Sequence, residues 1–118
     1  MGYDISLNDP VTGEVLELDV PHHMRGSTYQ VGGTTRAWLS VTYNYASHFY
    51  AVLGEDGIRT LYGKSGAQSI PLLRSAADKL KDDVSSNYWD STEGNAKAAL
   101  MQLLALAQMR PDGVWDGD

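Results

Sequence analysis

Residues 96–109, AKAALMQLLALAQM, decide the fold, because they form the longest run of strong helix formers in the chain. The sequence predicts a helix here, with a cap within 90–92 and with Glu93 completing a capping box to Asp90. Arg110-Pro111 should end it, since the residue before a proline is disfavoured in helical conformation.

This predicted helix has almost no polar face, and a helix that is apolar all round is normally buried all round. It is too short to span a bilayer and contains Gln102, which argues against a membrane protein. Two arrangements remain open. The helix is either the central helix against a sheet and a second helix, or part of it forms an interface in a homo-oligomer.

The segments before it supply further helices. Aromatic and aliphatic residues at helical spacing predict a short helix over 46–53, ended by Gly54. A turn of helix is expected around 58–62. Another helix should begin at Ser69, with Pro71 in its first turn, where the missing N–H is harmless. Its buried stripe is predicted to be Ile70, Leu73, Ala77 and Leu80.

The N-terminal half reads as strands. YDISL at 3–7 and VLELDV at 15–20 alternate apolar and polar residues around an Asp-Pro and Thr-Gly turn, which predicts a hairpin. Pro21 should end the second strand, because it lacks a ladder donor. AWLSVTYN at 37–44 is the third strand. We therefore predict one α+β domain over 1–118, with a small antiparallel sheet of about three strands and two or three helices packed on one face.

The composition limits the possible functions. The chain has 118 residues, no cysteine and a net charge of −6, so thiolate chemistry is excluded. Its nine basic residues do not cluster, which argues against direct binding of nucleic acid. The acidity either keeps the protein soluble or matches a basic partner surface, including one that normally holds nucleic acid.

Several stretches carry a family resemblance: MGYDISLNDPVTGEVLELDVPHHMRG, TYNY, GIRTLYGKSG and TEGNAKAALMQLLALAQMRPDGVWDGD. With these, nearly the whole chain resembles a family of small bacteriophage and prophage proteins. The closing GNAKAAL and MRPDGVWDGD are the most distinctive parts. The resemblance implies an accessory protein of the host bacterial cytoplasm that acts against host defences, and it carries over no functional residues.

PHHMRGSTYQVGGTTRAW at 21–38 is the most unusual connection. His22 and His23 are adjacent, so in an extended segment they point to opposite sides and cannot easily share a metal. Neither a metal motif nor a nucleophile elbow is present, so we expect no metal, no cofactor and no enzyme activity. A small hydrolase that uses His22 or His23 remains an alternative. The glycines of VGGTT at 31–35 form either a tight turn or an anion-binding nest.

Aromatic residues are the remaining clue, since the chain has seven tyrosines and three tryptophans. Rings can stack on a base while arginine pairs with phosphate and an amide reads an edge, although several rings could equally fill the core. Candidate ligand residues are His22, His23, Arg25, Thr34, Asn44, Tyr45, Arg59, Tyr62, Asn95 and Trp115. The sequence thus favours a binding protein for a nucleotide-like signal or a host defence protein.

Overall fold

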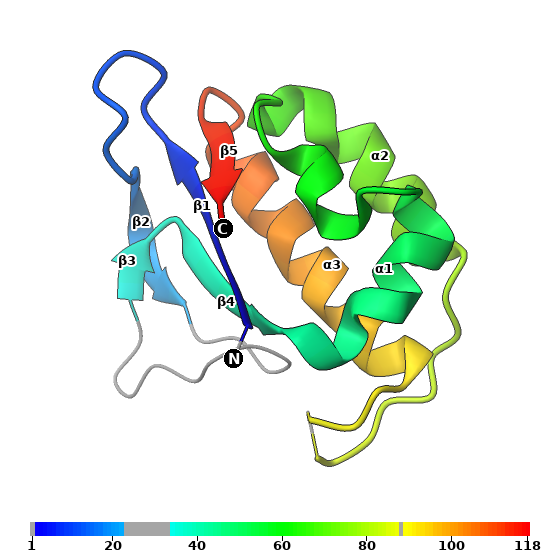
Figure 1. Cartoon of the computed structure of the whole chain (residues 1–118). Coiled ribbons are helices and arrows are strands. Elements are labelled where there is room, and N and C mark those ends of the chain that lie inside the picture. The colour runs from blue at the N-terminus through cyan, green and yellow to red at the C-terminus, as the bar shows by residue number, and fades with distance from the viewer. Residues whose placement is uncertain (1, 23–33, 88) are drawn as a thin grey trace.

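The computed structural model describes residues 2–22, 34–87 and 89–118. The predicted α+β class is confirmed: the molecule has a three-stranded antiparallel sheet in the order β4-β1-β5, a two-stranded sheet of β2 and β3, and three α-helices. Figure 1 shows the helices gathered on one side of the three-stranded sheet. The elements are β1 Gly2–Asn8, β2 Glu17–His22, β3 Thr34–Arg36, β4 Trp38–Thr42, η1 Tyr43–Tyr45, α1 Ala46–Leu53, η2 Gly57–Leu61, α2 Gly66–Asp78, α3 Glu93–Met109 and β5 Val114–Gly117.

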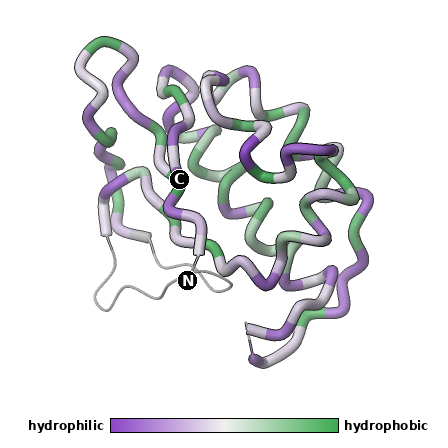
Figure 2. The backbone as a smooth tube through the Cα atoms, in the orientation of Figure 1, coloured by the Kyte–Doolittle hydropathy of each residue, from purple (hydrophilic) through white to green (hydrophobic). Residues whose placement is uncertain are grey.

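Strand β1 is the centre of the sheet, and its alternation places Tyr3, Ile5 and Leu7 on the buried face. Residues paired across antiparallel strands point to the same side of the sheet. Val41 pairs with Tyr3, and Trp115 pairs with Leu7, so both belong to this buried face. The face meets the helices and forms the core with them. Figure 2 shows hydrophobic residues spaced along the helices, whereas the segment leading into α3 is mostly hydrophilic.

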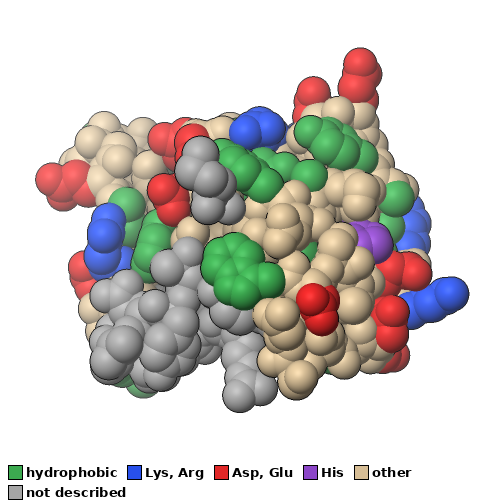
Figure 3. Space-filling view, turned by 60° about the horizontal axis from the view of Figure 1, so that its bottom comes forward, with side chains coloured by type: hydrophobic (Ala, Val, Ile, Leu, Met, Phe, Trp, Pro, Cys, Tyr) green, Lys and Arg blue, Asp and Glu red, His purple; other side chains and the backbone are tan. Residues whose placement is uncertain are grey.

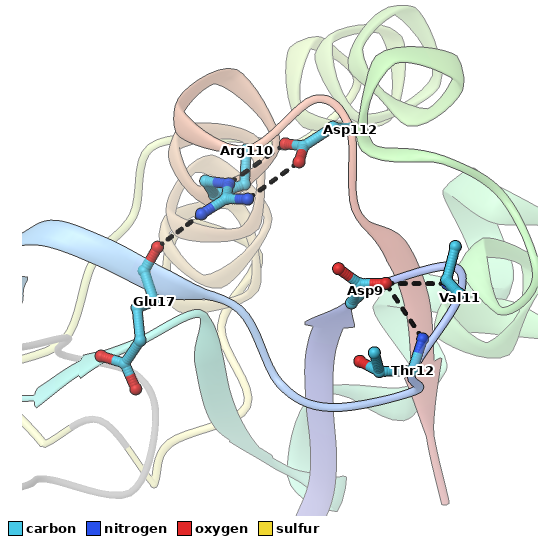
Figure 4. Close-up of polar contacts among 6 residues, drawn as sticks. All are labelled: Asp9, Val11, Thr12, Glu17, Arg110 and Asp112. Carbon is cyan, nitrogen blue, oxygen red and sulfur yellow. Dashed lines mark hydrogen bonds and ion pairs between the residues drawn. The ribbon is translucent and has the colours of Figure 1, made fainter.

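The predicted N-terminal hairpin is wrong, although its turn is present. The Asp9 carboxylate accepts from the N–H groups of Val11 and Thr12 and closes the turn (Figure 4). Among the described residues, Asn8 and Val15 form the single bridge across this turn, and β2 then pairs with β3. The reason is that both edges of β1 are taken, one by β4 and the other by β5. Strand β5, in the tail, was not predicted.

Pro21 does not end β2, which continues to His22. The register between β2 and β3 shifts between Glu17 and His22, and the paired positions lie at these two ends. Proline is tolerated where the ladder does not require its N–H.

Helix α2 begins three residues before the predicted start at Ser69. Ser65 and Gln68 form a capping box, in which each side chain accepts a hydrogen bond from the other residue's backbone N–H. This box, and not Pro71, sets the start of the helix. Pro71 therefore lies inside the helix and is exposed. The predicted stripe is largely confirmed: Leu73, Ala77 and Leu80 are buried, and Ile70 is half-buried.

The elements between β4 and α2 follow the sequence more closely. Helix α1 over Ala46–Leu53 is confirmed, and Gly54 follows it with a φ of +96°. The predicted turn of helix is η2, displaced by one residue. Strand β4 is shorter than the predicted 37–44, because Tyr43–Tyr45 form the 3-10 turn η1.

Helix α3 begins at Glu93, and its cap is Thr92, whose hydroxyl accepts from the N–H of Asn95. The predicted capping box is wrong, because Glu93 accepts from the N–H of Lys81 instead. The predicted end of the helix at Arg110-Pro111 is confirmed. The helix packs against α2 along much of its length, but Met101 and Met109 are 47% and 43% exposed, so it is not buried all round. None of the helices of the described chain is long and apolar enough to cross a membrane.

Arg110 ties the end of α3 to β2 (Figure 4). Its guanidinium donates to the carbonyl of Glu17 over 2.9 Å and makes two hydrogen bonds to the carboxylate of Asp112. This pairing lowers the pKa of the Asp112 carboxyl and raises that of Arg110. The contact fixes where β5 starts, since Asp112 and Gly113 lead directly into that strand.

Candidate functional site

Within the described part of the chain, the residues nominated from the sequence do not converge on one place. His22 and Thr34 are paired positions of β2 and β3, and the Thr34 hydroxyl accepts from the N–H of Arg36. His23 and Arg25 lie outside the described residues, as does the glycine pair of VGGTT. The remaining candidates lie in the core, around the segment before α3, and beside the end of β5.

Tyr45 and Trp115 belong to the core, because both are at most 1% exposed. The indole N–H of Trp115 donates to the Ser69 hydroxyl over 2.7 Å, and that hydroxyl donates to the carbonyl of Gly66. Trp115 therefore docks on its own domain. Its polar atom is satisfied internally by the first turns of α2.

Asn95 is buried and holds the segment before α3 in place. Its amide oxygen accepts from the N–H of Ser85 over 3.1 Å. Its amide nitrogen donates to the carbonyls of Asn87 and Asp90 at 3.2 and 2.9 Å. We call Asn95 with Ser85, Asn87 and Asp90 the Asn95 hub. Because three backbone groups share one side chain, Asn95 acts here as a structural anchor.

Asn44 and His48 join this segment to η1 and α1. The amide nitrogen of Asn44 donates to the carbonyl of Trp89 over 2.9 Å, and the Nε2 of His48 lies 3.1 Å from the carbonyl oxygen of Ser91. The indole-bearing Trp89 is thereby held beside η1 while remaining 45% exposed. Both contacts are on the surface, so they cost less to lose than those of Asn95.

His48 and Ser91 form a serine–histidine contact that was not predicted. The Ser91 hydroxyl lies 3.2 Å from the same Nε2 that approaches the Ser91 carbonyl. An Nε2 that donates to this carbonyl cannot also act as a base toward the hydroxyl. A nucleophilic pair further needs a group that orients the other ring nitrogen. Within 2–22, 34–87 and 89–118, no carboxylate hydrogen-bonds to the Nδ1 of His48.

An exposed aromatic surface lies at the start of β1. The Tyr3 ring is 3% exposed, and the Tyr43 ring stands edge-on to it at 4.7 Å between centroids. The guanidinium carbon of Arg59 lies 5.0 Å from the Tyr3 ring centroid, within cation–π range. Tyr50, with 46% exposure, packs against Gly57, which lies two residues before Arg59 in η2. Burial is the first cause that raises the pKa of Tyr3, and the Tyr50 phenol is the second. We call Tyr3, Tyr43, Tyr50 and Arg59 the aromatic face.

The exposed rings of this face are held by their surroundings. Tyr43 directly follows β4, and its ring packs edge-on against the Tyr3 ring. The Tyr50 ring lies against Gly57, where a Cβ atom would come within 3.0 Å of two ring carbons. Gly57 also has a φ of +57°, which favours glycine. The rings are thus presented in fixed positions before any partner arrives.

Tyr62 lies behind this face, against the end of β5. Its hydroxyl is buried and finds no hydrogen-bond partner within the described ranges. Burial is the main cause that raises its pKa to about 12, followed by the negative charge of Asp118. Gly117 packs directly on it, because a Cβ there would lie 2.5 Å from the Tyr62 oxygen. Tyr62 is therefore a packing residue with a neutral phenol at ordinary pH.

Acidic residues surround the aromatic face. Arg59 donates to the main-chain oxygen of Asp118, whose carboxylate accepts from the N–H of Asp4. Glu55 and Asp56 precede Gly57, the residue that supports Tyr50. These four acidic residues are exposed, and within the described part of the chain they outnumber Arg59, the basic residue of this face. Figure 3 views the end of the molecule where β1 begins: hydrophobic side chains lie in separate groups, and acidic side chains lie along much of the edge.

Sequence reasoning missed Tyr3 and Tyr50 as part of a surface. Tyr50 lies in the predicted helix 46–53, whereas Tyr43 lies in the predicted strand 37–44 and in the structure forms the 3-10 turn η1, so no common spacing linked the two rings. Tyr3 carried no signal for a surface role either, because its alternation assigns it to the core. Among the described residues, no group of three histidine or acidic side chains could hold a metal ion.

Comparison with known proteins adds no relative. No protein-family model matches the chain, and it matches none of the curated proteins or solved structures with which it was compared.

Proposed function

We propose that this chain is a small phage-encoded binding protein without enzyme activity, which counters host defence by occupying a host protein in the bacterial cytoplasm. The aromatic face is the observation that carries the proposal. Its exposed tyrosines and arginine are residue types that dominate binding energy in protein interfaces. The phage context rests on the resemblance of the sequence alone.

The other version of this function is sequestration of a nucleotide-type signal. Arg59 above Tyr3, with two further rings nearby, offers the chemistry to stack a base and pair with phosphate. The four acidic residues around the face oppose a phosphate-bearing ligand. We therefore place the protein target first. A thermal-shift screen against nucleotides and cyclic dinucleotides separates the two, since a bound nucleotide raises the melting temperature.

The test of the proposed function uses phage plating. The wild-type chain, expressed in bacteria that carry a defence system, should restore plating of a phage that the system blocks. Tyr43→Ala/Tyr50→Ala should lose this effect. Val11→Ala/Val84→Ala is the matched control, because it also removes two exposed apolar side chains, which belong neither to the face nor to the exposed side of α3. If the tyrosine variant folds and still restores plating as the wild type does, the face does not carry the function.

A homo-oligomer is the second candidate, and the exposed side of α3 favours it. Ala98, Met101, Ala105 and Met109 follow helical spacing and are at least partly exposed, and no charged residue lies between 98 and 109. Two acidic copies could approach there without close repulsion. Because the chain has no native cysteine, Ala105→Cys should form a disulfide-linked dimer, while Ser75→Cys on exposed α2 should not. A monomer by light scattering at high concentration would exclude this state.

A further inference from the structure

We infer that the aromatic face takes a basic peptide segment of its partner, with an arginine or lysine side chain lying against the exposed rings of Tyr43 and Tyr50. This inference rests on the proposed function, because it names the chemistry of the partner. It can be tested without that partner in hand. Three features of the described residues support it: rings held in place, their exposure, and the sign of the surrounding charge.

The rings are preorganised for a cation. Tyr43 is fixed by its edge-on contact with buried Tyr3, and Tyr50 by its contact with Gly57. Interfaces gain affinity when anchors are already ordered, since less side-chain entropy is lost on binding. Arg59 already occupies the face of Tyr3, so the molecule itself shows a guanidinium accommodated on one ring of this cluster. Tyr43 and Tyr50 remain more than a third exposed and are free to accept another.

The charge around the rings selects a basic partner. Among the described residues at the face, four exposed acidic side chains outnumber the guanidinium of Arg59. Asp118 accepts hydrogen bonds from Arg59 and Asp4, and Glu55 and Asp56 directly precede Gly57, which contacts Tyr50. Arg59 is itself occupied by the main-chain oxygen of Asp118. The charge that the described residues place around the face is therefore net negative, which attracts a cationic segment and repels nucleic acid and other polyanions.

The acidic residues can be changed without disturbing the fold. Asp56 lies at the start of η2, but its side chain makes no capping hydrogen bond. Glu55 precedes it and is exposed. Glu55→Gln/Asp56→Asn thus removes two charges near the face. Glu14→Gln/Asp78→Asn removes two charges from exposed positions elsewhere and keeps the same net charge, which makes it the matched control.

The experiment measures binding of a fluorescent peptide by anisotropy. In the probe, arginines alternate with glycine and serine; a second peptide carries citrulline in place of arginine, and a third carries glutamate. We expect the wild type to bind the arginine peptide and to lose affinity as salt rises from about 0.05 to about 0.5 M. Tyr43→Ala/Tyr50→Ala should weaken binding about tenfold. Glu55→Gln/Asp56→Asn should weaken it about fivefold, and the matched control should bind like the wild type.

The inference is overturned if the arginine and citrulline peptides bind equally, or if both acid variants weaken binding to the same extent. It is also overturned if the folded tyrosine variant binds as the wild type does. These failures differ from failure of the proposed function. Plating that depends on the tyrosines, without arginine-peptide binding, leaves the function standing and removes the basic partner. Peptide binding without any effect on plating removes the function and leaves the ligand chemistry.

Discussion

The Asn95 hub and the aromatic face both consist of residue types that can bind a ligand. The hub stabilises the fold, whereas the tyrosines of the face remain exposed to solvent. In the hub, an amide is 3% exposed, and its oxygen and nitrogen are both bound to backbone groups. In the aromatic face, the Tyr43 ring packs on Tyr3 and the Tyr50 ring packs on Gly57, while both tyrosines remain exposed to solvent. The side chain of Asn95 makes its hydrogen bonds inside the fold, whereas the two tyrosines keep exposed surface that a partner can contact.

A side chain whose polar atoms are satisfied inside the fold has little left to offer a ligand. Asn95 therefore has a structural role. A ring fixed at one edge and exposed at the other retains contact area for a partner. Four variants test this distinction, beginning with the largest expected effect.

Asn95→Ala should cost about 3 kcal/mol of unfolding free energy, because it removes three hydrogen bonds of a buried side chain to partly buried backbone groups. Urea unfolding measures the loss. Asn44→Ala is the matched control, since it removes an exposed amide with one side-chain amide contact, to Trp89. It should cost less than about 1 kcal/mol. Equal losses in the two variants would show that the hub is not the anchor.

Gly94→Ala tests the packing beneath the hub. A Cβ at Gly94 would lie 2.5 Å from the nitrogen of Val84 and 2.6 Å from the carbonyl carbon of Asp83, and these backbone atoms cannot move aside cheaply. Overpacking costs about 1–3 kcal/mol, whereas alanine gains at most about 1 kcal/mol in a helix over glycine. We expect a net loss of about 1–2 kcal/mol in the same unfolding assay. A more stable variant would mean that the backbone of the segment before α3 shifts readily to make room for the added methyl group.

Much of this fold could be predicted from local sequence. Helix 46–53, the end of α3 at Arg110-Pro111 and the α+β class follow from spacing and stop signals, which act within a few residues. The strand pairing could not be predicted, because it depends on β5, only four residues long and more than a hundred residues from β1. Once β5 and β4 occupy both edges of β1, no hairpin with β2 can extend.

The candidate site was less predictable for a similar reason. Asn44, Asn95 and Trp115 were singled out by type, and type does not reveal whether a partner inside the chain satisfies a polar atom. Trp115 meets Ser69, which is 46 residues away, and Asn44 meets Trp89, which is 45 residues away. Tyr3 joined the aromatic surface only because Arg59 and Tyr43 converge on it in three dimensions.

Tyr43→Ala tests the face for a structural role. Its edge-on contact with Tyr3 predicts a loss of about 0.5–1.5 kcal/mol at most, and its exposure places the expected value near the lower end. Chemical unfolding should therefore register a small change, while plating and peptide binding should fall. A loss as large as that of Asn95→Ala would make Tyr43 a framework residue and would remove it from the face.

Tyr62→Phe should have the smallest effect at neutral pH and a distinct one in base. Because the Tyr62 hydroxyl is buried and unpaired among the described residues, its removal should be neutral or slightly stabilising near pH 7. Its folded pKa of about 12 lies above the unfolded value of 10, so the folded state holds the proton more tightly. Ionisation of Tyr62 should therefore not lower the stability of the wild type below about pH 10, and it should lower that stability progressively between about pH 10 and 12. Thermal unfolding of both proteins across this range isolates Tyr62, since all other titrating groups are shared. Parallel curves would mean that the phenol reaches solvent or a partner, and Tyr62 would then join the aromatic face as a residue able to donate a hydrogen bond to a ligand.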